Sequence, residues 1–440
     1  MIIPKIYREH ETGILDLDHQ GEGLPSPILF RRKKESGKCA SFRVSDGKIE
    51  ICFSYFVGAD WVPGFQNKKS FFVEPKINTK SIPKSREEDK GIIEDDLVKI
   101  DILKMLFSAL SHPEIQGYTQ ELYEIKFDQP SISLDRKLDL LSPLLIIQYL
   151  SLVKEIVRKG LKRSYYKVEQ NLYSKVKGKI LVSQTIKQNK VKNRNFHTYC
   201  SFDEFGIDGK ENRLLKKALN FSQRYLWSFK EFSNKSFFTE TYNFIQPAFR
   251  DVSDDVDLHD IKNQKFNAFY KEYREAMHLA QLILQRFGYN INAINNRATI
   301  PTPPFWIDMS KLFELYVLGL LKDSNKHGSK ILYHPTTKGN ELDYLLVDGD
   351  NSIVIDAKYK LGYKFTSHEG YHEDIRQVSG YARLKNVRQK AGVTNQDQLL
   401  DCLIIYPDQE GLESIPEKFK EVEIDAYERV YKVGVKLPTL

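Results

Sequence analysis

The sequence predicts an α+β protein of several domains, and three observations support that class. The first part of the chain contains β-branched and aromatic runs such as residues 48–57. The middle part carries apolar residues at helical spacing, and the last part alternates short strands with helices. The 440 residues suffice for two or three domains, each able to bury its own core. We therefore expect a β-rich region at 1–125, a mainly helical region at 126–300 and an α/β domain at 301–440.

Composition and charge narrow the class of protein further. Aromatic residues make up 12% of the chain, which excludes disorder as the main state. The net charge of +7 permits nucleic-acid binding without requiring it. The four cysteines form no C-x-x-C pair, so we expect neither a structural zinc site nor a disulfide framework. No signal-peptide core and no apolar run of membrane-spanning length is found, so we expect a cytoplasmic protein without membrane contact.

In the first two regions, strand and helix signals follow one another along the chain. Ser142 and Pro143 begin a helix, because serine can cap it and proline fits its first turn. Gly160 ends that helix, since glycine readily adopts the left-handed conformation of a helix stop. The patterns predict strands at 48–57 and 70–77 and helices at 142–160, 212–227 and 266–287.

The last region begins at the prolines 301, 303 and 304, which we interpret as a domain boundary crossed by few backbone hydrogen bonds. An amphipathic helix follows, from about Met309 to Leu320. A hairpin turn is expected at 348–351. The remaining pattern predicts strands at 331–334, 342–347, 352–359 and 402–406 and a helix at 373–384, hence a βαβ crossover after the hairpin.

The hairpin carries two carboxylates and a lysine at informative positions. Residues two apart on a strand point to the same face, so Asp356 and Lys358 project together. If the hairpin pairs, Asp343 comes near Asp356, and the two carboxylates can bind Mg²⁺, which would polarise a phosphate and activate water. Lys358 would orient that water or stabilise the transition state. The alternative is a surface hairpin with an ordinary Asp and Lys, but Asp356 interrupts an apolar run, where a polar residue is costly without a function.

Several flanking residues have two readings each. Gln377 and Tyr381 stand four apart on the predicted helix and belong either to the site or to an ordinary helix face. Glu314 either supplies a further carboxylate or is a solvated helix residue, and the second reading is slightly preferred. His368 and His372 are interpreted as surface histidines rather than zinc ligands, because a glycine stands between them and the surrounding sequence is typical of a loop.

These residues are similar to two known patterns. Leu342-Asp343 and Asp356-Ala357-Lys358 resemble the two halves of the PD-(D/E)xK nuclease motif, with its proline missing. Gln377 and Tyr381 resemble the Q-x-x-x-Y helix of RecB-like nucleases. The whole chain in turn resembles the McrC family, through motifs in the family's order at 55–58, 72–77, 158–166, 176–180, 211–216 and 312–314.

The resemblance implies a DNA endonuclease subunit of a McrBC-like, modification-dependent (type IV) restriction system, with a PD-(D/E)xK restriction-endonuclease-like domain at 301–440. It would cut modified double-stranded DNA with Mg²⁺, for which Mn²⁺ can substitute. Its partner would be a McrB-like AAA+ GTPase hexamer, and the absence of a G-x-x-x-x-G-K-[ST] motif agrees with that division of labour. The implied catalytic residues are Asp343, Asp356, Lys358, Glu314 and Gln377, with Asp343 and Asp356 as metal ligands.

The resemblance also assigns the N-terminal and central regions to docking of the partner. Basic residues of the central region have two interpretations: they contact the partner or DNA, or they are solvated surface residues. These residues are Lys177, Lys179, Lys187, Lys190, Lys192, Arg194 and Arg213. The alternative function for the whole chain is a non-catalytic assembly factor that activates an AAA+ NTPase.

Overall fold

The structure is a computed structural model of the chain. It describes residues 4–15, 24–31, 37–46, 48–64, 69–75, 77–78, 97–98, 100–110, 112–126, 128–135, 140–227, 236–257, 271–286, 299–325, 328–337, 340–360, 363, 371–393, 399–416, 424 and 427–439. The chain divides into two compact units, Met1–Leu140 with Thr299–Leu440, and Leu141–Ala298. The division at residues 125 and 300 that the sequence suggested stays a prediction.

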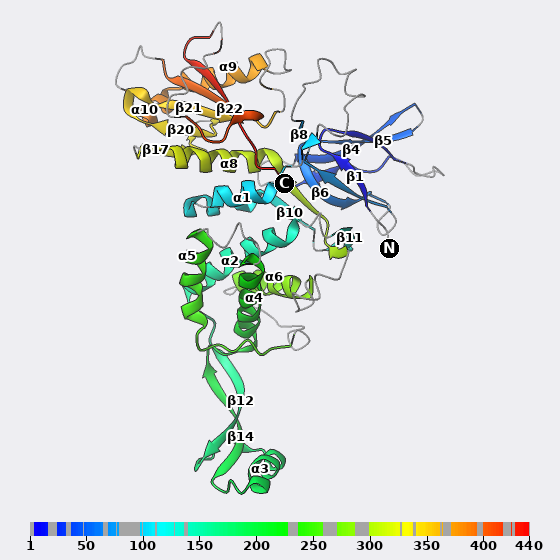
Figure 1. The fold of residues 1–440 in the computed structure, drawn as a ribbon, viewed down its shortest axis with the longest axis vertical. Helices are drawn as coiled ribbons and strands as arrows, with labels where there is room; N and C mark the ends of the chain where they lie inside the picture. Colours follow the sequence, from blue (N-terminus) through cyan, green and yellow to red (C-terminus); the bar gives the residue numbers. More distant parts are fainter. Residues whose placement is uncertain are drawn as a thin grey trace. The chain divides into compact units, whose positions relative to one another are not determined.

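The first unit begins with a five-stranded sheet in the order β1-β7-β6-β16-β10 (Figure 1). Its strands are β1 (Lys5–Arg8), β7 (Ser70–Glu74), β6 (Phe56–Trp61), β16 (Phe305–Asp308) and β10 (Tyr123–Ile125). β16 lies between β6 and β10, antiparallel to both. The expectation that few backbone hydrogen bonds cross the prolines at 301–304 is therefore wrong. Phe305, Trp306 and Ile307 are buried in this sheet, and Trp306 belongs to an aromatic core on one of its faces.

A four-stranded sheet packs with the first one around an aromatic core. Its order is β2-β5-β4-β3, with β2 (Thr12–Leu15), β5 (Lys48–Phe53), β4 (Gly37–Ser45) and β3 (Ile28–Phe30). The shared core includes Tyr7, Phe30, Phe56, Phe71 and Trp306. The same unit holds β8 (Ile77–Asn78), β9 (Leu97–Val98), α1 (Ile102–Leu110), the 3-10 helix η3 (Pro113–Glu121), β11 (Ile132–Asp135) and β15 (Thr299–Thr302).

A second five-stranded sheet carries the hairpin that the sequence predicted. Its order is β17-β20-β21-β22-β23, with β17 (Lys330–Tyr333), β20 (Tyr344–Val347), β21 (Ile353–Ala357), β22 (Asp401–Leu412) and β23 (Val430–Val435). β20 and β21 are antiparallel, and β21 and β22 are parallel, which confirms the hairpin and the crossover. The crossover contains α9 (Tyr371–Ala382) and α10 (Lys385–Ala391), which share a core with one face of the sheet. α8 (Met309–Ser324) contacts β17 and β21, and the short β18 (Thr336–Thr337), β19 (Asn340–Glu341) and η9 (Gly349–Asn351) complete this part.

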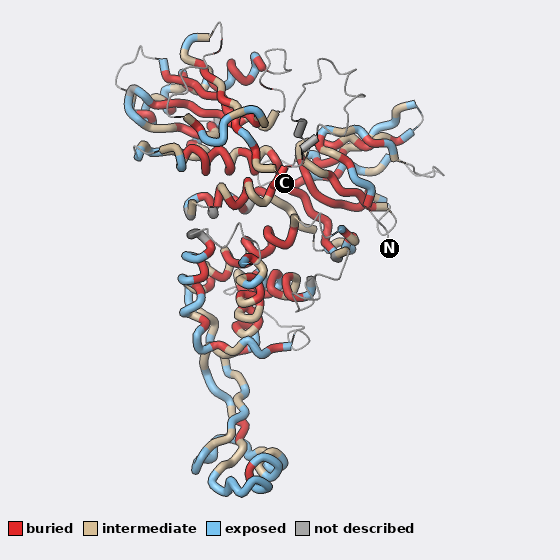
Figure 2. The backbone as a smooth tube through the Cα atoms, in the orientation of Figure 1, coloured by how far each residue is buried: buried red, intermediate tan, exposed pale blue. Residues whose placement is uncertain are grey.

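The second unit is a helical bundle with a long β-ribbon. The helices are α2 (Leu141–Lys159), α4 (Lys210–Trp227), α5 (Ser236–Ile245) and α6 (Lys271–Arg286). The short 3-10 helix η6 (Gln246–Phe249) directly follows α5. The ribbon pairs β12 (Ser164–Tyr173) with β14 (His197–Gly206) and carries β13 (Lys179–Ile180), α3 (Val182–Gln188) and η5 (Lys190–Lys192) at its tip. Figure 2 shows that most of the ribbon is exposed or intermediate. The sequence predicted helices that correspond to α2, α4 and α6, but not α5. It did not predict the ribbon either, because neither of the ribbon's faces is consistently apolar.

Among the described residues, no helix combines the length and the apolar character that a membrane crossing needs.

Candidate functional site

Asp356 and Lys358 lie at the end of β21 and contact each other. Their side chains form an ion pair of 2.9 Å between Oδ2 and Nζ. Asp356 is only 3% exposed, because α9 covers the face of β21 to which it points. Burial raises the pKa of Asp356, and the charge of Lys358 offsets this only in part. Burial lowers the pKa of Lys358, but the carboxylates of Asp356, Asp343 and Asp374 together outweigh burial. The net shift is upward, so Lys358 stays a cation at neutral pH.

Asp343 lies directly across the hairpin from Asp356. The ladder pairs Tyr344 with Ile355, and the next position along it places Asp343 opposite Asp356. The Oδ2 atom of Asp343 accepts the backbone N–H of Ala357 at 2.7 Å. Burial and the charges of Asp356 and Glu314 raise the pKa of Asp343 well above its usual range. The hairpin thus holds two carboxylates in a place that favours a compensating cation.

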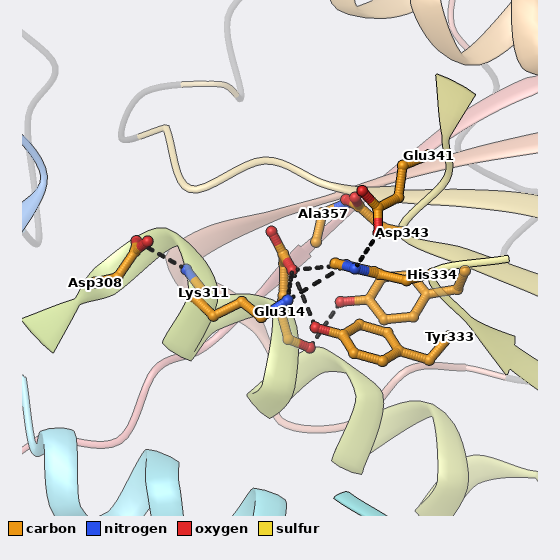
Figure 3. A network of polar contacts seen from close by, with 9 residues as sticks. Asp308, Lys311, Glu314, Tyr333, His334, Glu341, Asp343 and Ala357 are labelled. Carbon is orange, nitrogen blue, oxygen red and sulfur yellow. Dashed lines mark hydrogen bonds and ion pairs between the residues drawn. The ribbon is translucent and has the colours of Figure 1, made fainter. Parts of the chain in front are cut away.

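Glu314 points from α8 into the site, as Figure 3 shows. Its Oε2 atom accepts from the Tyr333 hydroxyl at 3.1 Å and from Lys311 Nζ at 3.2 Å. Burial raises the pKa of Glu314, but the hydrogen bond with His334 and the Lys311 charge outweigh it and the net shift is downward. The preferred reading of Glu314 as a solvated helix residue is therefore wrong.

His334 is a site residue that sequence reasoning missed. Its Nε2 atom lies 3.1 Å from Oε2 of Glu314, and its Nδ1 atom lies 3.1 Å from Oε1 of Glu341 (Figure 3). Its backbone N–H donates to the carbonyl of Asp343 at 2.9 Å. The residue has a φ of 46°, in the left-handed region, where histidine is more tolerated than most side chains. A single histidine after a strand gave no signal of this in the sequence.

Gln377 contacts Lys358 rather than the carboxylates. Its Oε1 atom accepts from Lys358 Nζ at 3.0 Å, and its Nε2 atom donates to the Tyr381 hydroxyl at 2.7 Å. Asp374, one turn earlier on α9, is buried and lies 3.8 Å from Lys358 Nζ and 2.7 Å from Lys360 Nζ. α9 therefore supplies two polar partners, Gln377 and Asp374, to the ammonium group of Lys358.

Other candidates from the sequence lie apart from this cluster. His372 is exposed, and its Nδ1 atom lies 3.3 Å from the Tyr427 hydroxyl; His368 lies outside the described residues. Arg213 pairs with Asp208, with 2.7 Å between Nη2 and Oδ2, so its guanidinium has an internal partner. The other basic candidates, Lys177, Lys179, Lys187, Lys190, Lys192 and Arg194, are exposed at the tip of the ribbon.

The donor set suits a divalent cation. In the described part of the chain, ligand atoms of Glu314, His334 and Asp343 all lie within 4.8 Å of one another. Both ring nitrogens of His334 lie 3.1 Å from a carboxylate oxygen, Nε2 from Glu314 and Nδ1 from Glu341, so the ring sits between two acidic side chains. Carboxylate oxygens suit Mg²⁺, and the added imidazole suits Mn²⁺ as well. The expected ligand pair was Asp343 and Asp356; the grouping seen here keeps Asp343 and adds Glu314 and His334.

Comparisons with known proteins show what the chain is similar to. Two chains of solved structures are similar to this chain. One is from the refined half-complex of the tetradecameric assembly of Thermococcus gammatolerans McrB AAA+ hexamers with bound McrC. The match has 16% sequence identity, covers 91% of this chain and 81% of that chain, and has a TM-score of 0.35. The other is from the Thermococcus gammatolerans McrBC complex (14% identity, 85% of this chain and 99% of that chain, TM-score 0.27). No curated protein sequence matches the chain. The family model described as "McrBC 5-methylcytosine restriction system component" matches residues 65–407. The chain therefore belongs to the family of McrBC restriction system components.

Proposed function

We propose that the chain is the DNA endonuclease subunit of a McrBC-like, modification-dependent restriction system. It would hydrolyse phosphodiester bonds in modified double-stranded DNA with Mg²⁺, or with Mn²⁺ in its place. One observation carries the proposal: Glu314, His334 and Asp343 group their ligand atoms within 4.8 Å, beside the ion pair of Asp356 and Lys358. These ionisable groups come from α8, from the end of β17 and from the β20–β21 hairpin, and few structural roles explain their gathering at one largely buried place.

The residues divide the chemistry among them. Glu314, His334, Asp343 and Asp356 would hold the metal, which would supply a Lewis acid for the phosphate and a more acidic bound water. Glu341 would orient the imidazole of His334 by accepting its Nδ1–H, a common arrangement behind histidine ligands. Lys358 is kept cationic by Asp356 and directed by Gln377. A lysine in that state stabilises negative charge on a phosphate or orients water, and is unsuited to removing a proton.

We further propose that the ribbon tip docks a McrB-like AAA+ GTPase hexamer. The family name describes a component of a restriction system, which implies other components. The tip exposes apolar side chains that a solvated extension would not need: Tyr173, Val176, Val182, Val191 and Phe196 are each at least 61% exposed. They alternate with seven exposed Lys and Arg residues, and no Asp or Glu occurs between Gln170 and Phe202. An apolar and strongly basic tip fits an acidic protein surface.

The alternative is a non-catalytic assembly factor that activates an AAA+ NTPase. The ribbon tip alone would serve that function, whereas the grouped carboxylates and Lys358 would not be needed for it.

One assay separates the two functions. The chain is mixed with its AAA+ partner, GTP and plasmid DNA containing 5-methylcytosine, with Mg²⁺ or with EDTA. Cleavage that requires Mg²⁺ supports the nuclease. Stimulated GTP hydrolysis without any cleavage, in Mg²⁺ and in Mn²⁺, would establish the assembly factor instead.

A further inference from the structure

Tyr359 joins the N-terminal sheet to the end of β21. Its hydroxyl donates to Oε1 of Glu9 at 2.8 Å, and its ring centroid lies 5.8 Å from that of Phe313 on α8. Tyr359 directly follows Lys358 in the chain, and Phe313 directly precedes Glu314. Tyr359 is therefore next to Lys358 in the chain and contacts the neighbour of Glu314. Its hydroxyl is held by Glu9, near the start of the chain.

Glu9 is an unusual residue for a purely structural place. It follows β1 and is 0% exposed. Its backbone N–H donates to the carbonyl of Glu74 at 3.1 Å, continuing the parallel pairing of β1 with β7. A buried carboxylate gives up strong hydration, and hydrogen bonds must replace it. Its backbone is fixed by the sheet, so its side chain offers Tyr359 a rigid acceptor.

The contact between Tyr359 and Glu9 is one of several that anchor the chain at the end of β21. The last hydrogen bond from β21 to β22 is that of the Lys358 N–H with the carbonyl of Ile405, at 2.8 Å. Beyond it the chain leaves the sheet, and the Tyr359 side chain is the next anchor that fixes the backbone. A displacement of a catalytic group by about 1 Å can slow a reaction by about 100-fold. The Lys358 ammonium has its own partners in Asp356 and Gln377, and the contact that holds Tyr359 fixes the backbone from which this ammonium extends.

We propose that Tyr359, held by Glu9, is a positioning residue that fixes the Lys358 end of β21 against α8. Through it, the geometry of the site depends on the N-terminal sheet. The inference rests on the nuclease function proposed above. Neither residue touches metal or DNA in this scheme; both act through Lys358 and its spacing from Glu314.

The kinetic test uses the full chain with its partner, GTP, Mg²⁺ and 5-methylcytosine-containing DNA. Tyr359→Phe removes only the hydroxyl and keeps the ring against Phe313. We expect Tyr359→Phe and Glu9→Ala each to lower kcat by about tenfold with an unchanged KM for DNA. Glu9→Gln should keep most of the activity, since its amide oxygen still accepts the hydroxyl. The double variant Glu9→Ala/Tyr359→Phe should lose no more than the stronger single variant.

The matched control is Glu11→Ala, which removes a carboxylate two residues away that accepts the N–H of Arg8 at 2.7 Å. It should cleave at the wild-type rate. The second readout needs no cleavage: amide hydrogen exchange over residues 356–360 should become faster in Glu9→Ala, but not in Glu9→Gln or Glu11→Ala. If the wild-type chain cut nothing, the nuclease assignment would fall, while the exchange data would still decide whether Glu9 fixes the strand.

Two results would overturn the positioning role and leave the nuclease function in place. One is wild-type kcat together with wild-type exchange in both Tyr359→Phe and Glu9→Ala. The other is an equal loss in Glu9→Gln and Glu9→Ala, because the hydrogen bond would then not be what matters.

Discussion

The Oδ2 atom of Asp343 accepts a hydrogen bond of 2.7 Å from the backbone N–H of Ala357. Ala357 stands between Asp356 and Lys358 in the chain, so this bond fastens Asp343 to the strand that carries these two proposed site residues. It also continues the pairing of β20 with β21 by a side chain, at the position where the backbone ladder ends. The spacing of the two carboxylates is thus set by the hairpin itself.

Asp356→Asn and Lys358→Met should each lower the rate of DNA cleavage by about 100-fold or more, with the fold retained. These conservative changes are chosen because Asp356 is 3% exposed and paired with Lys358. Asparagine and methionine nearly match the volumes of the side chains that they replace, whereas alanine at either position would leave a cavity. The measurement is the initial rate on modified plasmid. Lys385→Met, an exposed lysine on α10, is the control and should cut normally. Wild-type rates in Lys358→Met would exclude the lysine from the chemistry.

Metal binding should depend on His334 and Glu341, which the sequence did not identify, as well as on Asp343 and Asp356, which it did. By titration calorimetry on the full chain, Glu341→Gln should weaken Mn²⁺ binding by about tenfold, since Glu341 orients His334, and His334→Ala should weaken it more. Ca²⁺ should bind without supporting cleavage, because its larger and looser shell places the attacking water differently. His372→Ala is the control and should bind Mn²⁺ normally. Undiminished Mn²⁺ affinity in an Asp343→Asn/Asp356→Asn double variant would disprove the metal site.

The part of the site that the sequence revealed is the part that local geometry determines. Asp356 and Lys358 share a face because side chains alternate along a strand, and Asp343 meets them because a short hairpin has one register. Glu314 was interpreted as a solvated residue because it stands beside the apolar stripe of α8. Helical periodicity cannot reveal that His334, which follows β17, contacts it. Long-range packing decides such contacts, and a single sequence does not carry that information.

The same distinction explains what was missed in the fold. Three helices of the second unit, α2, α4 and α6, were predictable from apolar spacing, whereas α5 was missed. The ribbon, exposed on both faces, has no periodicity to detect. β16 was missed because the prolines before it were interpreted as a boundary. Prolines can lie next to a strand without ending the domain, and Phe305 and Trp306 find their partners far away in the sequence.

The fragment 301–440 should not fold alone. In this fragment β16 lacks both of its neighbouring strands, β6 and β10. Phe305 and Trp306, which are 0% exposed in the whole chain, would then be exposed. Trp306 would also lose the acceptor of its indole N–H, Oδ2 of Asp60 at 2.8 Å. Circular dichroism and amide NMR dispersion measure the outcome. The fragment 141–298, which forms a compact unit by itself, is the matched control and should unfold cooperatively. A well-dispersed spectrum from 301–440 would contradict this account of β16.

Removing the ribbon tip should separate docking from metal binding. Tyr173 and His197 are direct partners at the end of the β12–β14 ladder, so residues 174–196 can be replaced by an Asn-Gly turn, which closes such a ladder with the right twist. The deletion takes out Val176, Val182, Val191 and Phe196 and the tip cations, but nothing from the first unit. We expect the shortened chain to lose stimulation of the partner's GTP hydrolysis while it binds Mn²⁺ with unchanged affinity. A control that replaces only the seven tip cations by Ser tests how much of the docking is electrostatic, and its effect should shrink as salt rises. If the shortened chain still stimulates the partner fully, docking belongs to another surface and the ribbon tip is a solvated extension.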